Sequence, residues 1–145
     1  KMSEFSEAVE AGDVGLVEAR LLAGNDVNVA DQLGWTPLHE AALSNGGPAL
    51  CELLLRHGAN VQAANKYGET PLHLAAGNET RSVCAICALL IRHGADRDAL
   101  DEECRTPLDI AEDRGSLRPA DEQSSLLALL QVSPARAATR AAAAA

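Results

Sequence analysis

A four-residue phrase recurs along the chain at a nearly constant interval, and this repetition constrains the fold more than any other feature. The phrase Thr-Pro-Leu-His begins at Thr36 and at Thr70, and it returns as Thr-Pro-Leu-Asp at Thr106. The intervals are therefore 34 and 36 residues. A second phrase, which contains His-Gly-Ala, follows the first in two of the copies, at residues 54–60 and 90–96. Such a period indicates stacked units that bury their apolar faces against one another.

Each unit reads as two helices followed by a turn. Thr36 can cap the first helix, since its hydroxyl can accept a hydrogen bond from a free backbone N–H of the first turn. Pro37 suits the first helical position, where a missing N–H costs nothing, and His39 lies where a capping box places the side chain that reaches back. Asp109 takes that place in the last copy and suits the positive end of a helix. Gly58 predicts the end of the leucine-rich second helix.

The two phrases, in this order and at this interval, resemble the ankyrin repeat. The resemblance covers about residues 3–131 and implies an all-α repeat fold, an ankyrin α-solenoid of four helix-turn-helix repeats with β-hairpin fingers. We expect one ankyrin-repeat domain over residues 1–131. Its repeats are expected at about residues 3–31, 32–65, 66–101 and 102–131.

Several segments depart from the repeat pattern. The first repeat lacks Thr-Pro, as expected of an end repeat that faces water on one side. The fourth has Cys104 where a finger glycine is expected, and an extra loop at residues 116–120. The inner repeats are lengthened around residues 45–48 and 77–83. These insertions either serve for binding or reflect tolerated drift.

The repeat pattern stops after Gln131, and residues 132–145 form an alanine-rich tail. Three interpretations stay open for this tail. It is a disordered segment, an artefact in which alanine stands for other side chains, or a basic segment that docks onto an acidic groove through Arg136 and Arg140.

The charge and hydropathy of the chain exclude some classes of function. The formal net charge is -9, and nucleic-acid binding depends on Lys and Arg that neutralise phosphates. We therefore expect no nucleic-acid partner and favour a basic protein partner. No apolar run approaches the roughly 18 residues of a membrane span, and no signal-peptide pattern is present. These features predict an intracellular protein, cytoplasmic or nuclear, without membrane insertion.

The cysteines and histidines are expected to be structural. Cys84 and Cys87 form a Cys-x-x-Cys pair within an expected helix, without the second pair or the nearby histidine that a zinc site needs. All four histidines lie at repeated positions, and no nucleophile or Gly-rich phosphate loop accompanies them. We predict reduced cysteines, no metal, no cofactor and no enzymatic activity.

The rare aromatic residues, 2% of the chain, indicate a binding surface. Trp35 follows the finger glycine Gly34, Leu33 precedes the same glycine, and Tyr67 precedes the next finger glycine. In the ankyrin fold these fingers line the edge of the concave face, and Trp and Tyr are enriched in binding hot spots. Packing between adjacent fingers is the other interpretation of these side chains.

The resemblance also assigns to the concave face the residue after the motif histidine and residues near the end of the first helix. An acidic run over residues 96–113 adds carboxylates next to the fingers. The pattern predicts an apolar groove at the second and third repeats that turns acidic toward the fourth. The expected partner-binding residues are Leu33, Trp35, Tyr67, Glu40, Leu43, Leu74, Asn78, Asp101, Glu102, Glu103, Ile110 and Asp113.

These features predict a monomeric protein–protein interaction module, an adaptor, reader or chaperone, that binds an extended basic or mixed basic and apolar segment in the concave groove. One alternative is an ankyrin-type inhibitor of an enzyme such as a cyclin-dependent kinase. Those inhibitors shorten the first helix of the second repeat, whereas residues 36–45 read as a full-length helix here. The other alternative is a structural domain of a larger chain.

Overall fold

A computed structural model describes residues 4–44, 46–78, 82–114 and 119–131. The helices are α1 (Glu4–Ala11), α2 (Val14–Leu22), α3 (Pro37–Leu43), α4 (Gly47–Arg56), α5 (Pro71–Ala76), α6 (Val83–Arg92), α7 (Pro107–Asp113) and α8 (Ala120–Leu130). Parts of the predicted insertions and of the loop at 116–120, and the whole tail after residue 131, lie outside the described residues.

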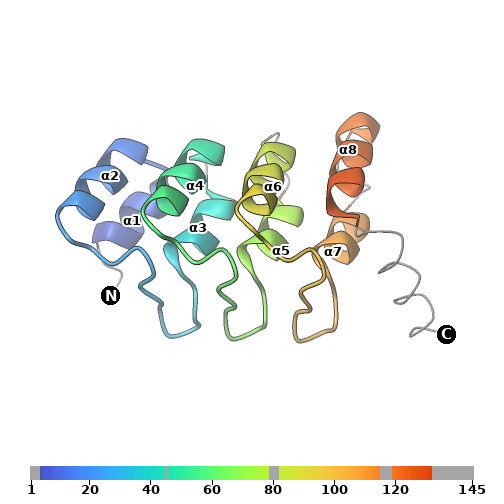
Figure 1. The fold of residues 1–145 in the computed structure, drawn as a ribbon, viewed down its shortest axis with the longest axis horizontal. Coiled ribbons are helices and arrows are strands. Elements are labelled where there is room, and N and C mark those ends of the chain that lie inside the picture. Colours follow the sequence, from blue (N-terminus) through green and yellow to red (C-terminus); the bar gives the residue numbers. More distant parts are fainter. Residues whose placement is uncertain (1–3, 45, 79–81, 115–118, 132–145) are drawn as a thin grey trace.

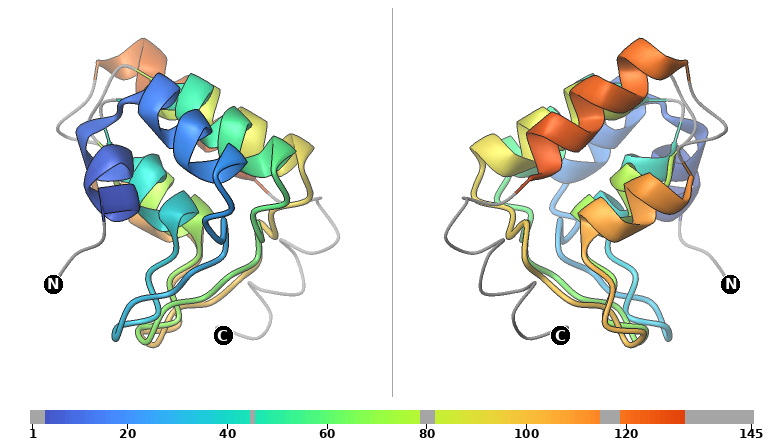
Figure 2. Two further views of the ribbon diagram at one scale, coloured as in Figure 1. Left: turned by 90° about the vertical axis from the view of Figure 1, so that its left-hand side faces the viewer. Right: turned by 90° about the vertical axis from the view of Figure 1, so that its right-hand side faces the viewer.

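The helices form consecutive pairs that stack in chain order (Figure 1). The first helices of the pairs, α1, α3, α5 and α7, form one layer, which we call the inner layer, and the second helices form the outer layer (Figure 2). Each inner helix packs against its own partner, and α1, α3 and α5 each pack against the next inner helix. This arrangement confirms the repeat of two-helix units that the sequence predicts.

The inner helices begin as the motif predicts. At α5, the Nδ1 atom of His73 accepts a hydrogen bond from the backbone N–H of Thr70 at 3.1 Å, and Thr70 Oγ1 accepts from the His73 N–H at 3.4 Å. At α7, the carboxylate of Asp109 replaces the imidazole and accepts from the Thr106 N–H at 2.9 Å. A proline is the first residue of α3, α5 and α7. The predicted capping boxes are thus confirmed.

The outer helix α4 ends at a glycine, also as predicted. Gly58 follows the last turn with φ of 90°, a conformation that side chains with a Cβ rarely adopt. The Gly58 N–H donates to the Leu55 carbonyl at 3.1 Å, and the Ala59 N–H donates to the Leu54 carbonyl at 3.0 Å. These two bonds are the Schellman pattern, which satisfies carbonyls that the end of a helix leaves free. Gly94 ends α6 with φ of 95°.

The first repeat is built to face water on one side. Its Leu16 aligns with Leu50 of the next repeat, which is fully buried, but Leu16 is itself exposed. Arg20 likewise aligns with the fully buried Leu54 and pairs with Glu4 at the surface. A charged residue at a core position of the other repeats agrees with the predicted capping role of this unit.

Three hairpin-shaped loops project from the helical layers (Figure 1), and we call their tips the first (31–35), second (65–69) and third (101–105) fingers. Adjacent fingers are joined by backbone hydrogen bonds, from the Lys66 N–H to the Leu33 carbonyl at 2.7 Å and from the Glu102 N–H to the Tyr67 carbonyl at 2.9 Å. Because no described residue is in a strand, the β-hairpin pairing predicted for the fingers is not confirmed.

A finger needs glycine at its turn only where another finger packs against it. Gly34 has φ of 79°, and a Cβ there would come within 3.1 Å of the Asn65 Cα atom of the second finger. Cys104 takes the equivalent place in the third finger with φ of 59°. No further finger packs against the third one within the described part of the chain (Figure 1). The side chain therefore has room, although the left-handed backbone conformation remains unfavourable for it.

The cysteines of the helices serve the core, as predicted. Cys51 and Cys87 are fully buried. Burial raises the pKa of the Cys51 thiol to about 12, so that this group stays protonated and behaves as a small apolar side chain. The Cys84 thiol donates a weak hydrogen bond to the Glu122 carbonyl of α8 at 3.7 Å. The pair Cys84 and Cys87 thus helps to pack α6 in the stack.

Candidate partner-binding face

The apolar finger residues predicted to contact a partner are accessible. Leu33 of the first finger is 41% exposed and Tyr67 of the second is 40% exposed. Both precede the finger glycine, and the equivalent residue of the third finger is Glu103. The fingers thus present two apolar side chains and then a carboxylate in order along the stack.

Trp35 is half-buried, so it packs within the chain and is also partly accessible, and its role in binding stays a prediction. Its ring lies 5.9 Å from the imidazole of the buried His39, with an angle of 48° between the planes. Its carbonyl accepts from the Asp31 N–H at 3.0 Å and closes the finger. The indole therefore packs on the start of α3 and leaves part of its surface for a partner.

Glu40 is the most unusual predicted residue, because one of its oxygens is buried without a partner. The Oε2 atom is removed from solvent and has no hydrogen-bond partner among the described residues. Burial, reinforced by the charges of Asp31 and Glu10, raises the pKa of the Glu40 carboxyl to about 7. Asp31 belongs to the first finger and Glu10 to α1, so three elements bring carboxylates to this point. An ionised Glu40 lacks a counter-charge within the described residues.

The position that follows the motif histidine or aspartate changes from acidic to apolar along the stack. Glu40 in α3 is followed by Leu74 in α5 and Ile110 in α7, and all three are half-buried. Leu74 packs against the core. Leu43, one turn after Glu40, is 43% exposed. These side chains lie on consecutive inner helices, so the structure gathers them on one layer.

Asp101 of the third finger is engaged within its own finger, which differs from the role predicted for it. Asp101 is buried, and its Oδ1 accepts from the backbone N–H groups of Glu103 and Arg105, each at 2.9 Å. Its Oδ2 accepts from the Arg105 guanidinium at 3.1 Å. Both oxygens are thus engaged, so Asp101 shapes the finger and has no free oxygen for a partner.

The charges of this finger act on one another. Burial alone raises the pKa of the Asp101 carboxyl, but the backbone N–H groups of Arg105 and Glu103 and the Arg105 guanidinium outweigh it, and the pKa lies below its ordinary value. Glu103 is exposed and lies 3.5 Å from the same guanidinium. Glu102 and Asp113 are exposed as well, and Asp113 acts on Arg105. The accessible acids here are therefore Glu102, Glu103 and Asp113.

Asn78 is the second predicted contact residue that the structure places in the interior. It is buried, and its side-chain N–H donates to the Ala42 carbonyl of α3 at 2.8 Å. This bond ties the end of α5 to the preceding repeat. Because the side chain is enclosed between two repeats, it stabilises the stack and is not accessible to a partner.

The histidines of the motif have the structural role predicted for them. His39 and His73 are buried, and each also bonds to the following repeat: their Nε2 atoms lie 2.9 Å from the carbonyls of Glu69 and Arg105. His57, in contrast, is exposed at the end of α4. Burial lowers the pKa of His39, although the Glu69 carbonyl and carboxylate partly oppose this effect.

The sequence interpretation missed Asp31, which affects both the fold and the Glu40 site. Its Oδ1 accepts from the backbone N–H groups of Leu33 at 2.8 Å and Trp35 at 2.9 Å. Asn65 and Asp101 do the same in the other fingers. The sequence does carry a signal for this role, because Asp31, Asn65 and Asp101 recur at the repeat intervals of 34 and 36 residues.

The comparison with protein families agrees with this architecture. The family model described as ankyrin repeats (3 copies) matches residues 5–101, which is more than half of the chain. The chain belongs to the ankyrin-repeat family. The match includes α1 to α6, and the helix pair of α7 and α8 follows it in the stack. No curated protein matches the chain. Ankyrin repeats generally mediate protein–protein interactions.

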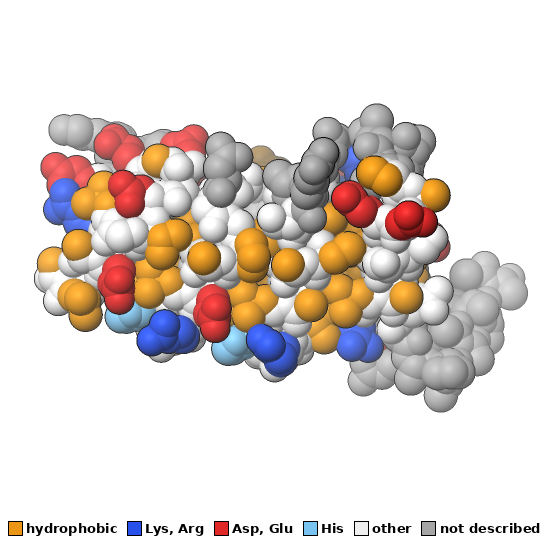
Figure 3. All heavy atoms as spheres, turned by 90° about the horizontal axis from the view of Figure 1, so that it is seen from above, with side chains coloured by type: hydrophobic (Ala, Val, Ile, Leu, Met, Phe, Trp, Pro, Cys, Tyr) orange, Lys and Arg blue, Asp and Glu red, His pale blue; other side chains and the backbone are white. Residues whose placement is uncertain are grey.

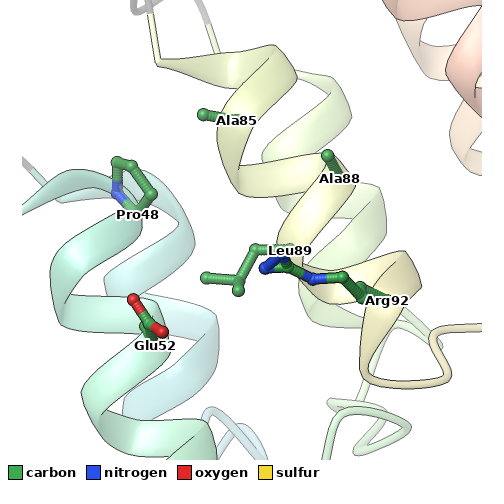
Figure 4. A pocket seen from close by; sticks show the side chains of 6 residues that line it. All are labelled: Pro48, Glu52, Ala85, Ala88, Leu89 and Arg92. Atoms are coloured by element: carbon green, nitrogen blue, oxygen red, sulfur yellow. The ribbon is translucent and has the colours of Figure 1, made fainter.

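The outer layer of this ankyrin-repeat chain carries a band of apolar side chains along its length (Figure 3). Within it, a shallow cavity of about 260 Å³ lies between α4 and α6 (Figure 4). Its lining consists of Pro48, Glu52, Ala85, Ala88, Leu89 and Arg92. Because it holds one acid and one base and is otherwise apolar, it favours no single class of ligand.

Two further classes of function find no support in the part of the chain that the structure describes. No helix there is both long and apolar enough to cross a bilayer. No group of three or more His, Cys, Asp and Glu side chains in the same ranges is arranged to hold a metal ion. The accessible residues among those predicted to contact a partner lie on the inner layer and on the fingers.

Proposed function

We propose that this chain is a protein–protein interaction module that binds an extended segment of another protein across the inner layer and the fingers. The segment carries Lys or Arg together with apolar side chains. Roles as an adaptor, a reader of basic tails or a chaperone of basic clients would all use this surface.

One observation carries the proposal: the buried, unpartnered Oε2 atom of Glu40. A buried acceptor without a hydrogen bond costs about 1 to 3 kcal/mol, and more when it is charged. Glu40 as a whole is only half-buried, so a Lys or Arg side chain at its accessible part would supply a positive charge that offsets the repulsion from Asp31 and Glu10. A cationic partner is therefore the ligand that relieves most of the local cost.

The apolar contacts of the proposed complex come from the fingers. Leu33 and Tyr67 are exposed, and the part of the Trp35 ring that is not packed on His39 lies in the same row of fingers. Aromatic and aliphatic side chains that a partner removes from water supply most of the binding free energy of such surfaces. Exposed acids such as Glu102 and Asp113 would mainly speed association and make it sensitive to salt.

A capture experiment with matched variants tests this proposal. The whole chain and three variants are immobilised: the triple variant Leu33→Ala/Trp35→Ala/Tyr67→Ala, the variant Glu40→Gln, and the control Leu22→Ala. Leu22 is the most exposed large apolar residue of the described chain and lies on α2 in the outer layer. Circular dichroism first confirms that every variant is folded, and proteins captured at low and moderate salt are then compared.

The proposal requires that basic proteins bind the wild type and the Leu22→Ala control, bind the triple variant and Glu40→Gln more weakly, and dissociate as salt rises. Equal capture by the wild type and the triple variant would place the binding surface elsewhere, for example on the outer layer. The proposal would then be wrong, although the fold would be unaffected.

Inhibition of a kinase is the less favoured function. The inhibitors named above shorten the first helix of the second repeat, but α3 has 7 residues here, as many as α7 and one more than α5. No described feature of the chain favours that function over peptide binding.

A further inference from the structure

Three equivalent side chains on consecutive inner helices differ in chemistry in a way that gives the proposed face a direction. Glu40, Leu74 and Ile110 each follow the motif histidine or aspartate, and each is half-buried. Equivalent positions in a stack of repeats lie in a row, one step apart. The row therefore begins with a carboxylate and continues with two aliphatic side chains.

We propose that Glu40 selects a Lys or Arg side chain of the partner and thereby fixes the order in which the segment lies on the chain: the cation over α3, and aliphatic side chains over α5 and α7. This inference rests on the proposed function and goes beyond it, because it states the order of the partner's residues.

The cation belongs at Glu40 because the other acids of the face already have partners or are fully solvated. Asp101 bonds to two backbone N–H groups and to Arg105. Glu103 shares the same guanidinium. Glu102 is exposed, where an ion pair contributes little. Glu40 alone of these residues combines partial burial with an oxygen that lacks a partner within the described residues.

The Leu74 and Ile110 positions, in contrast, favour apolar side chains of the partner. Leu74 packs against the core. Ile110 packs beside the end of α5, since its Cγ2 atom lies 3.2 Å from the place where a Cβ on Gly77 would be. Neither position offers a hydrogen-bonding side chain, so a charge placed over them would lose water without compensation. Apolar side chains gain there instead.

The charged groups near Glu40 make its selection of a cation depend on pH. Asp31 faces it from the first finger and Glu10 from α1. On the other side, α5 has one titratable residue, His73, which bonds to Thr70 and to the Arg105 carbonyl. The carboxyl of Glu40 has a pKa of about 7. Binding of a cation therefore weakens as the pH falls from 8 to 6, by at most about tenfold, because the ionised fraction of Glu40 falls over this range.

Selection of peptides from a random dodecamer library displayed on phage tests the order directly. The baits are the whole wild-type chain, Glu40→Leu, the exchange variant Glu40→Leu/Leu74→Glu, and the triple variant Leu33→Ala/Trp35→Ala/Tyr67→Ala, each confirmed to be folded. The exchange variant keeps the composition and net charge and moves the carboxylate one repeat along the row. Selected peptides are then synthesised, and their affinities for wild type, Glu40→Leu and the isosteric Glu40→Gln are measured at pH 8 and pH 6.

The wild type should select peptides in which two aliphatic residues are flanked on one side by a basic residue. The exchange variant should select peptides whose basic residue lies between aliphatic ones, and Glu40→Leu should bind the wild-type peptides about tenfold or more weakly. The inference is overturned if binding needs the finger residues but the exchange variant selects peptides with the basic residue in the same place as the wild type. It is also overturned if the peptide affinity of Glu40→Gln depends on pH as strongly as that of the wild type. If no peptide is enriched, or if the triple variant enriches the same peptides, the proposed function itself fails, and this inference fails with it.

Discussion

The imidazole of His39 joins two repeats: its Nδ1 accepts from the Thr36 N–H at 3.1 Å, and its Nε2 donates to the Glu69 carbonyl at 2.9 Å. The first bond fixes the start of α3, and the second holds the second finger against α3. One buried side chain thus couples the local structure of a repeat to its packing on the next. A change here should affect the cooperativity of the whole stack.

The variant His39→Ala should lower the free energy of unfolding by about 2 to 4 kcal/mol, because it leaves the buried Thr36 N–H and the partly buried Glu69 carbonyl without partners and creates a cavity. Urea unfolding followed by circular dichroism measures the change. His57→Ala is the control, since His57 is exposed at the end of α4, and it should change the stability by less than about 0.5 kcal/mol. A similar loss in both variants would contradict the bridging role of His39.

The two finger positions Gly34 and Cys104 should respond oppositely to substitution. Cys104→Gly removes a side chain from a left-handed conformation with φ of 59° and should stabilise the chain by up to about 1 kcal/mol. Gly34→Ala should destabilise it by more than about 1 kcal/mol, since its Cβ would meet the backbone of Asn65 and Lys66 at 3.1 and 3.2 Å. Thermal unfolding of both variants in a reducing buffer gives the comparison. Stabilisation by both substitutions would show that the close approach of the fingers is unimportant.

The helices and their ends could be predicted from the sequence because each is decided by neighbouring residues. Thr70 and His73 are three residues apart and form the capping box on their own. Gly58 ends α4 through bonds to carbonyls of the last turn. The same is true of the repeat itself, since each unit contains the residues that define it.

The burial of some predicted contact residues could not be foreseen, because it depends on hydrogen bonds within and between repeats. In the sequence, Asp101 is one member of an acidic run, but its Oδ1 accepts from two backbone N–H groups and its Oδ2 from the Arg105 guanidinium of the same finger. Asn78 reads as a surface amide, but it bonds to Ala42, 36 residues earlier. The pKa of Glu40 depends on Asp31 and Glu10, which lie in other elements. Only the fold brings these groups together.

Asp101 should tolerate asparagine much better than alanine. Asn65 in the second finger accepts from the equivalent backbone N–H groups at 2.9 and 3.0 Å, so Asp101→Asn can keep these bonds. It loses only the ion pair with the half-exposed Arg105, about 1 kcal/mol or less. Asp101→Ala leaves two N–H groups unpaired and should cost about 2 kcal/mol or more. Urea unfolding at pH 7 tests both, and equal losses would show that the ion pair dominates.

The pH dependence of stability should reveal the buried charge of Glu40. Its carboxyl has a pKa of about 7 in the folded chain against the ordinary 4.5, so between these values the folded state binds a proton that the unfolded state has lost. The free energy of unfolding therefore falls as pH rises from 4.5 to 7. Glu40→Leu, which places the residue of the next repeat there, removes this loss. It should raise stability at pH 8 by about 1 to 2 kcal/mol more than at pH 4.5, after allowance for partial exposure.

Urea unfolding of wild type and Glu40→Leu at pH values between 4.5 and 8 measures this difference. His39 acts in the opposite direction, because its lowered pKa makes its contribution fall as pH drops below 6.5, but it is present in both proteins and cancels. Glu10→Gln provides the second test. Loss of that neighbouring charge should lower the pKa of Glu40 and shift the midpoint of the pH dependence downward. A gain in Glu40→Leu that is constant with pH would show apolar packing alone, and Glu40 would then lack the unpaired charge that the binding of a cation requires.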